Sequence, residues 1–282
     1  MSISVRTWML TVITMVAFAA NSLLCREALR HTAIDAASFS VVRVVSGALV
    51  LTLLVWLRGR KRQLGGSWGS ALALLGYAAA FSFAYRSLTA GTGALLLFGA
   101  VQVTMISRGL LAGERLGAMQ SAGLVLAVIG LVALLLPGLS APEPVGAILM
   151  VSAGIAWGLY SLRGRSERDA LGGTAGNFVR AVPLAALIAI AVLVTGGSLS
   201  LDWLGLLYAA LSGAVASGLG YALWYTVLPS LPATFAATVQ LSVPVITAAA
   251  AAIFLGEAVT LRLMASSIAV LGGIALVIVR RR

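Results

Sequence analysis

Ten long apolar runs, separated by short connectors that hold most of the charged residues, account for almost the whole chain. A helix rises about 1.5 Å per residue and a bilayer's hydrocarbon core is about 30 Å thick, so about 20 apolar residues span it. The runs cover residues 7–24, 36–57, 68–85, 92–111, 118–136, 145–162, 174–195, 203–226, 233–255 and 263–279. The pattern predicts an all-α integral membrane protein with ten transmembrane helices.

The composition agrees with this pattern, since 61% of the 282 residues are hydrophobic and the mean hydropathy is +1.06. A net charge of +11 would suggest nucleic-acid binding in a soluble chain. Here the basic residues sort by side of the membrane instead. We therefore expect the lipid bilayer as the surrounding partner and no nucleic-acid partner.

The distribution of basic residues predicts the orientation. If the N-terminus is cytoplasmic, the outer side receives only Arg26, Arg30, Arg86 and Arg262. The inner side receives Arg6, Arg58, Arg60, Lys61, Arg62, Arg108, Arg115, Arg163, Arg165, Arg168, Arg280, Arg281 and Arg282. This excess obeys the positive-inside rule, so we expect cytoplasmic termini and a location in the inner (cytoplasmic) membrane.

Apart from one short serine pattern, the sequence carries no motif for catalysis or metal binding. Cys25 is the only cysteine, which excludes an intramolecular disulfide and a thiolate metal cluster. Gly65, Ser67 and Gly69 fit the esterase pattern around a nucleophilic serine. The only histidine, His31, is expected on the opposite side of the membrane, too far away to act as its base. We expect no enzyme activity, no metal and no cofactor.

The chain repeats itself at a separation of about 140 residues. Residues 111–116 match 254–259, and Arg43 matches Arg180. The repeat predicts two domains, 1–140 and 141–282, with five spans each. Because five is odd, the second domain would cross the membrane in the inverted orientation, an arrangement that builds many secondary transporters.

The sequence carries the marks of a known family: a Glu flanked by Leu and Gly ending the fourth and ninth spans, an Arg in the second and seventh, a Trp-Gly pair and a proline. These residues are Glu114, Glu257, Arg43, Arg180, Trp157, Gly158 and Pro244. With them the chain resembles the drug/metabolite transporter superfamily, whose members carry two EamA-type domains. It is most similar to exporters of aromatic and other neutral amino acids, which also extrude methyl viologen. The first half departs from the pattern, with Phe18-Ala19 in place of Trp-Gly and Val101 opposite Pro244.

Polar and aromatic residues recur at helical spacing in several spans and define candidate substrate-binding faces. The candidates are Asn21, Ser22, Tyr77, Phe81, Gln102, Trp157, Tyr160, Trp224 and Gln240, and Phe18 and Tyr221 lie on the same faces. An aromatic and amide lining suits a zwitterionic or weakly polar organic solute better than a metal ion. We expect amino acids as substrates, with organic cations as a further class. Ordinary packing is the alternative explanation of these aromatics.

A second group of residues is expected to have structural or gating roles. Arg43 and Arg180 lie inside their spans, where each could attract a substrate carboxylate. A structural clamp on helix-end carbonyls, or on a loop acid such as Asp35, is the equal alternative. Glu114 and Glu257 end their spans, so backbone or arginine partners are expected. Pro244 is a candidate hinge. The fifth and tenth spans are almost purely apolar, which predicts a monomer or a weak homodimer through these two spans.

The mechanism expected from the sequence is export by alternating access. All eight acids and the histidine lie in connectors or at span ends, so no central group is available to carry a proton. This favours facilitated diffusion. A proton-coupled drug or metabolite antiporter and a solute channel remain as alternatives.

Overall fold

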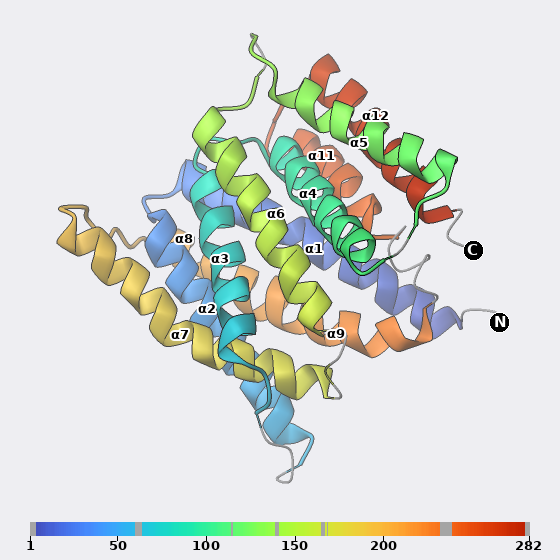
Figure 1. Cartoon of the computed structure of the whole chain (residues 1–282). Coiled ribbons are helices and arrows are strands. Elements are labelled where there is room, and N and C mark those ends of the chain that lie inside the picture. Colours follow the sequence, from blue (N-terminus) through green and yellow to red (C-terminus); the bar gives the residue numbers. More distant parts are fainter. Residues whose placement is uncertain are drawn as a thin grey trace.

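The protein is a bundle of packed helices (Figure 1). The computed structural model describes residues 4–59, 64–113, 115–138, 141–164, 167, 169–231 and 239–279. All regular structure in these ranges is helical. The elements are α1 (Val5–His31), α2 (Ala36–Leu57), α3 (Trp68–Ala84), α4 (Ala90–Leu111), α5 (Ala118–Leu135), α6 (Pro144–Gly164), α7 (Ala170–Val194), α8 (Trp203–Leu211), η1 (Ser212–Leu219), α9 (Gly220–Val227), η2 (Leu228–Ser230), α11 (Ser242–Phe254) and α12 (Leu261–Val279).

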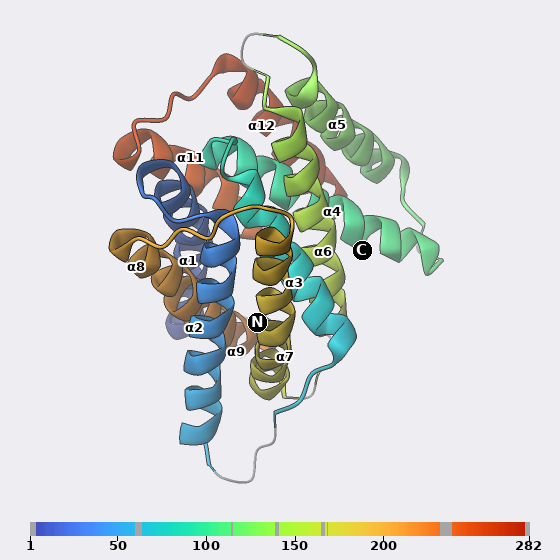
Figure 2. The ribbon, with the colours of Figure 1, turned by 90° about the vertical axis from the view of Figure 1, so that its left-hand side faces the viewer.

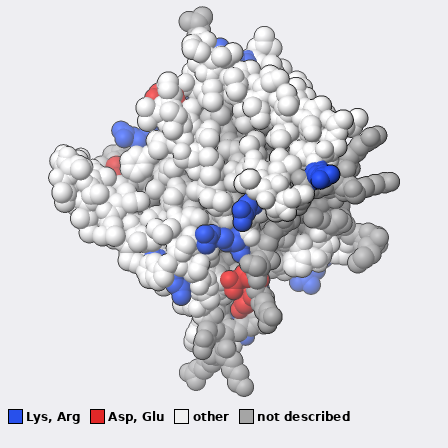
Figure 3. Space-filling model, viewed as in Figure 1, with Lys and Arg blue, Asp and Glu red and all other residues white. Residues whose placement is uncertain are grey.

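The expected multi-pass membrane architecture is confirmed. Eight helical stretches in the described part are long and apolar enough to cross a membrane, and α3 and α11 are shorter apolar helices. Uncharged residues cover nearly all of the described surface in Figure 3, with few charged side chains among them. Large apolar side chains such as Ile268, Phe254 and Trp56 are exposed. Such a surface is stable in lipid, because its apolar side chains contact apolar lipid tails instead of water.

Several polar residues lie at helix starts because their side chains cap the first turn. Ser4, Asp35, Ser67, Thr89, Asp169 and Asp202 each accept a hydrogen bond from a backbone N–H in the first turn of the helix that follows. These N-caps satisfy donors that have no partner within the helix. Ser67 is therefore the cap of α3, which accounts for the serine in the esterase-like pattern.

The first helix is longer than its apolar run predicts. It continues to His31, seven residues past the expected end at Leu24. Arg26, which we expected in the outer connector, is therefore helical and buried. The apolar run ends early because an arginine interrupts it, yet the helix continues because that arginine finds an acidic partner inside the protein.

The eighth span contains a π-helical segment that no pattern in the sequence predicts. The α-helix α8 passes into the π-helix η1 at Ser212 and returns to α-helix in α9 at Gly220. A π-helix bonds residue i to i+5, so Ser212 and Ser217 face nearly the same side. In an α-helix the same two positions would differ by about 140°.

The ninth span begins differently from our expectation. Residues 232–238 lie outside the described part, and the helical chain is interrupted at Leu241 before α11 starts. Pro244 therefore lies in the first turn of α11 rather than inside a continuous helix. Proline lacks the N–H that would bond to residue 240, which explains an interruption at this point. At the start of α11 the Ser242 hydroxyl donates to the Val239 carbonyl at 2.6 Å.

Helices at corresponding places in the two halves pack against each other. Close pairs are α2 with α7, α4 with α11 and α5 with α12, while α1 lies against η1, α9 and α11. The α5 and α12 pair stands at one side of the bundle in both views (Figures 1 and 2). Gly123 allows this approach, because a Cβ there would lie 2.6 Å from the Gly273 carbonyl oxygen.

Glycines four residues apart can form a packing seam between membrane helices, and the structure shows such a contact for one pair and a helix end for another set. Between α4 and α6, a Cβ at Gly154 would lie 2.6 Å from the Leu97 carbonyl oxygen, and one at Gly158 would meet Thr104. Gly113 follows α4 with a φ of +92° and has nothing within 4 Å of its Cβ position. Gly109, Gly113 and Gly117 therefore do not form a packing seam, because α4 ends at Leu111, before Gly113 and Gly117.

Candidate functional site

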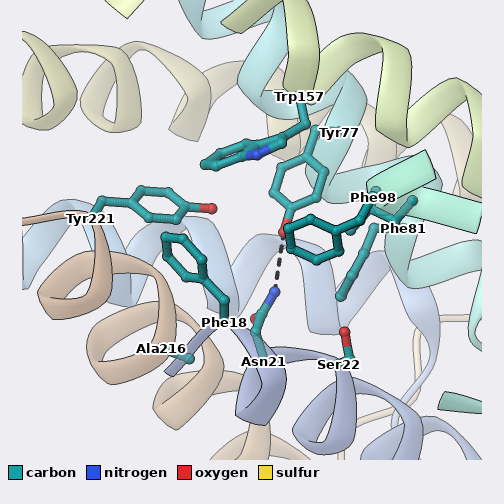
Figure 4. Close-up of a pocket in the computed structure, with 10 residues that line it drawn as sticks. Phe18, Asn21, Ser22, Tyr77, Phe81, Phe98, Trp157, Ala216 and Tyr221 are labelled. Carbon is teal, nitrogen blue, oxygen red and sulfur yellow. Dashed lines mark hydrogen bonds between the residues drawn. The ribbon is translucent and has the colours of Figure 1, made fainter. Parts of the chain in front are cut away.

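A cavity in the middle of the bundle collects side chains from both halves (Figure 4). Its lining residues are Phe18, Asn21, Ser22, Tyr77, Phe81, Leu97, Phe98, Trp157, Ala216 and Tyr221. Water-molecule centres fit in only about 20 Å³ of it, which is room for about one water. An organic solute can enter only if the surrounding helices or rings move apart.

Aromatic rings form most of the cavity wall. The Trp157 ring centroid lies 4.9 Å from those of Tyr77 and Tyr221, and Phe18 meets Tyr221 edge-on at 5.8 Å. Figure 4 shows the Tyr221 hydroxyl pointing toward the space beneath Trp157. Rings at these separations favour the tilted and edge-on contacts that also bind an aromatic ligand.

The structure brings five of the nine substrate-binding candidates to the cavity: Asn21, Ser22, Tyr77, Phe81 and Trp157. The other four lie outside its lining. Tyr160 packs behind Trp157 with ring centroids 5.5 Å apart, and Trp224 packs edge-on against Phe18 at 6.2 Å. Gln102 is buried in α4, and Gln240 is half-buried before α11.

Three lining residues had no signal in the sequence. Leu97 and Phe98 belong to a stretch of α4 that is apolar on all sides, so no face could be chosen. Ala216 reaches the cavity because η1 is a π-helix, which no residue pattern indicated. Phe18 and Tyr221 were on the expected faces but not among the chosen residues.

A polar network borders the cavity and joins four elements. The Ser212 hydroxyl of η1 donates to the Asn21 side-chain oxygen of α1 at 2.6 Å. The Asn21 amide donates to the Tyr77 hydroxyl of α3 at 3.1 Å, which also accepts from the Arg43 guanidinium of α2 at 2.8 Å. Arg43 in turn donates to the Ser217 hydroxyl at 3.4 Å. Both serines reach this network because the π-turn aligns them.

Arg43 is the charged member of the network and is 2% exposed. Its Cζ atom lies 4.9 Å from the centroid of the Tyr77 ring and 4.8 Å from that of Phe81. One guanidinium nitrogen, Nη1, is buried without a hydrogen-bond partner. The backbone here is also tight, since a Cβ at Gly213 would overlap the Arg43 carbonyl oxygen.

Arg180, the matching residue of the second half, has different partners. Its guanidinium donates to the carbonyl oxygens of Gly65 at 2.6 Å and Gly176 at 2.9 Å. Next to it, the Ser67 N–H donates to the Asn177 side-chain oxygen at 2.9 Å. Arg180 therefore holds the connector before α3 against α7 and does not border the cavity.

Glu257 gathers a second cluster at one end of the bundle. It accepts hydrogen bonds from Arg26 Nε at 2.9 Å and from the Ala90 N–H at 2.7 Å. Arg26 also donates to the Tyr85 carbonyl at 2.9 Å. The cluster ties the ends of α1 and α3 to the start of α4 and the connector after α11. Glu114, the matching acid, lies outside the described residues.

Acids outside the membrane-spanning segments are held by hydrogen bonds. Partial burial alone would raise the pKa of the Asp35 carboxyl, but hydrogen bonds from Ser38, Ser200 and Ala37 lower it below its ordinary value. Backbone N–H groups of Gly146 and Val145 likewise lower the pKa of Glu143.

No acid and no histidine lines the cavity among the described residues. None of these residues forms a group of three or more metal-ligating side chains.

A larger groove lies at the side of the molecule between α4, α5 and α6, with a volume of about 940 Å³. Its walls are mainly apolar, and Arg108 and Arg163 lie among its lining residues. The central cavity is the better candidate site because the polar network and residues from both halves meet there.

Comparison with known proteins identifies the family. The model of the EamA-like transporter family matches the chain twice, at residues 6–136 and 144–279. The chain belongs to the EamA-like transporter family. Membership makes the protein a multi-pass membrane transporter.

One sequence relative and one solved structure are similar to this chain over almost its whole length. An uncharacterized protein of Pseudomonas aeruginosa is 57% identical over 277 residues, which cover 98% of this chain and 96% of the relative. A protein of known crystal structure aligns with a TM-score of 0.65, covering 98% of this chain and 99% of its own. At 16% identity it is similar in fold alone.

Proposed function

We propose that this transporter exports aromatic and other neutral amino acids across the inner membrane. The observation that carries the proposal is the central cavity, where six aromatic rings face a small polar network. Aromatic walls stack with an apolar side chain, and amide and hydroxyl groups hydrogen-bond a polar head. The ten lining residues come from six helical elements, α1, α3, α4, α6, η1 and α9, so helix movement would open and close the site.

The two halves are proposed to work as inverted repeats that expose the cavity alternately to each side. The pairing of α2 with α7, α4 with α11 and α5 with α12 supports this, because corresponding helices then meet around one axis. Both termini are placed in the cytoplasm on the distribution of basic residues. The protein would act as a monomer, or as a weak homodimer through α5 and α12.

Transport is proposed to be facilitative. A proton-coupled exporter needs a buried ionisable group whose protonation competes with the substrate. Among the described acids, Asp35, Asp169 and Asp202 are N-caps, and Glu143 and Glu167 lie in connectors. Glu27 pairs with His31 near the end of α1, and Glu257 belongs to the cluster with Arg26. Asn21 and Ser22, which lie in the cavity, do not titrate. Export would follow the higher amino-acid concentration in the cytoplasm.

Counterflow in proteoliposomes tests this function. Vesicles loaded with unlabelled phenylalanine should transiently accumulate radiolabelled phenylalanine from outside, and threonine and methionine should be tested in parallel. A channel shows no counterflow. An imposed pH gradient should produce no lasting accumulation, and gradient-driven accumulation that a protonophore abolishes would establish the proton-coupled antiporter instead. Absence of saturable flux for all three amino acids would reject the proposed substrate class.

A further inference from the structure

Arg43 carries a buried charge for which the described residues offer no anion. The ion pairs in this part of the chain join Arg26 and Arg30 to Glu257 and His31 to Glu27. Arg43 instead has neutral partners, the hydroxyl groups of Tyr77 and Ser217. A buried guanidinium stays protonated, and a charge in the membrane interior is normally paired or functional.

The neutral partners leave the guanidinium incompletely satisfied. Nη1 is buried and has no acceptor, and the contacts to Ser217 are long at 3.4 Å. The rings of Tyr77 and Phe81 attract the cation through their faces. A ring face offers no lone pair in the guanidinium plane, so it cannot replace a carboxylate, which can accept two parallel N–H bonds.

Comparison with Arg180 argues against a purely structural role for Arg43. The two arginines occupy matching places in the two halves, and Arg180 clamps two backbone carbonyls with one nitrogen. Arg43 donates to no backbone carbonyl among its recorded side-chain bonds. The clamp explains one arginine of the pair and leaves the other available to a ligand.

We propose that Arg43 binds the carboxylate of the transported solute, and that an acid group is required for recognition. This inference rests on the proposed function. The guanidinium lies against Tyr77 and Phe81, which both line the cavity, and Tyr77 connects it to Asn21. When the rings move apart to admit a solute, Nη1 gains its missing acceptor, and the solute's side chain stacks between Trp157 and Tyr221. Organic cations without an acid group, methyl viologen included, are repelled by the same charge and are not carried.

Three related probes test the requirement for an acid: phenylalanine, 3-phenylpropionate, which lacks the amine, and 2-phenylethylamine, which lacks the carboxylate. Isothermal titration of the purified full chain in detergent should show binding of both acids and at least tenfold weaker binding of the amine. A charge-assisted hydrogen bond corresponds to about a tenfold to hundredfold change in affinity. Arg43→Gln should therefore bind both acids more weakly by about that factor, whereas the amine should bind more tightly once the repelling charge is removed.

Arg180→Gln is the matched control, because it removes a guanidinium from the corresponding place in the other half. It should lower the melting temperature but keep the preference for acids over the amine. If Arg43→Gln does not fold, Arg43→Lys serves in its place: it keeps the charge without the planar fork, so acids should bind more weakly while the amine stays excluded.

The inference is overturned if folded Arg43→Gln binds 3-phenylpropionate as tightly as the unmodified protein. Equal or tighter binding of 2-phenylethylamine by the unmodified protein, or no binding of either acid, also overturns it. Failure of the proposed function has a different signature. Acids would then bind and depend on Arg43, while phenylalanine would show no counterflow in proteoliposomes.

Discussion

Arg43 and Tyr77 contact each other in two ways at once. The guanidinium donates to the Tyr77 hydroxyl at 2.8 Å, and its central carbon lies 4.9 Å from the centroid of the same ring. The hydroxyl also accepts from Asn21 at 3.1 Å. One phenol thereby fixes the relative positions of α1, α2 and α3 at the wall of the cavity. A substitution that removes the hydroxyl and keeps the ring should show how much the hydroxyl contributes to stability.

Tyr77→Phe keeps the ring and removes the acceptor shared by Arg43 and Asn21. Leaving buried donors unsatisfied costs about 1–3 kcal/mol, so the variant should melt at a clearly lower temperature in detergent. Tyr208→Phe is the control, since Tyr208 lies half-buried in α8 with no recorded side-chain hydrogen bond. Equal melting temperatures for the two variants would contradict the role assigned to the Tyr77 hydroxyl.

Gly213→Ala tests the close approach of the π-helix η1 to α2. The added Cβ would overlap the Arg43 carbonyl oxygen, and overpacking of this kind costs about 1–3 kcal/mol. Gly272→Ala in α12 adds the same methyl group where nothing lies within 4 Å, so it should be neutral or slightly stabilising. Thermal unfolding of the two purified variants decides the matter. A stable Gly213→Ala protein would show that α2 and η1 are not held this closely.

The sequence predicted the parts of the fold that follow from hydrophobicity. Each of the ten apolar runs contains a helix. Departures arose where a tertiary contact overrides the local pattern. The α1 helix extends past its apolar run because Arg26 pairs with Glu257, a residue 231 positions away.

The site was predictable only where a helix has one distinctive face. Asn21, Ser22, Tyr77 and Trp157 stood out as polar or large aromatic residues among aliphatic ones, and all four line the cavity. Ala216 could not be found in this way, since its position depends on the π-turn of η1. The sequence also could not predict that Arg43 and Arg180 have different partners, because both occupy the same kind of sequence position.

Glu257→Gln should destabilise the end of the bundle where four elements meet. The substitution leaves Arg26 buried without a counter-ion, and breaking a buried pair costs about 3 kcal/mol. Glu27→Gln breaks the more exposed pair with His31 and should cost at most about 1 kcal/mol. Melting temperatures measured in one detergent compare the two. A loss no larger for Glu257→Gln than for Glu27→Gln would argue against a stabilising role for the cluster.

Asp35 should make stability depend on pH at the start of α2. Its pKa is lowered in the folded protein, so its contribution is fully present above the ordinary carboxyl range and is lost as pH falls through the folded-state pKa. Asp35→Asn should therefore be less stable than the unmodified protein at pH 7, and this difference should shrink in acid. The melting temperatures of both proteins from pH 7 to pH 3 test this, and a constant difference would contradict it.

The central claim is that the aromatic cavity is the place where the transported solute binds. Phenylalanine counterflow in proteoliposomes with equal amounts of inserted protein measures this directly, using Trp157→Ala and, as control, Trp203→Ala. Trp157 stacks with two tyrosines in the cavity wall, whereas Trp203 begins α8 with 78% of its surface exposed. Loss of an aromatic wall and its contact area should raise the phenylalanine concentration for half-maximal flux about tenfold. We expect that increase for Trp157→Ala and unmodified kinetics for Trp203→Ala, and unchanged kinetics in a folded Trp157→Ala protein would contradict the account.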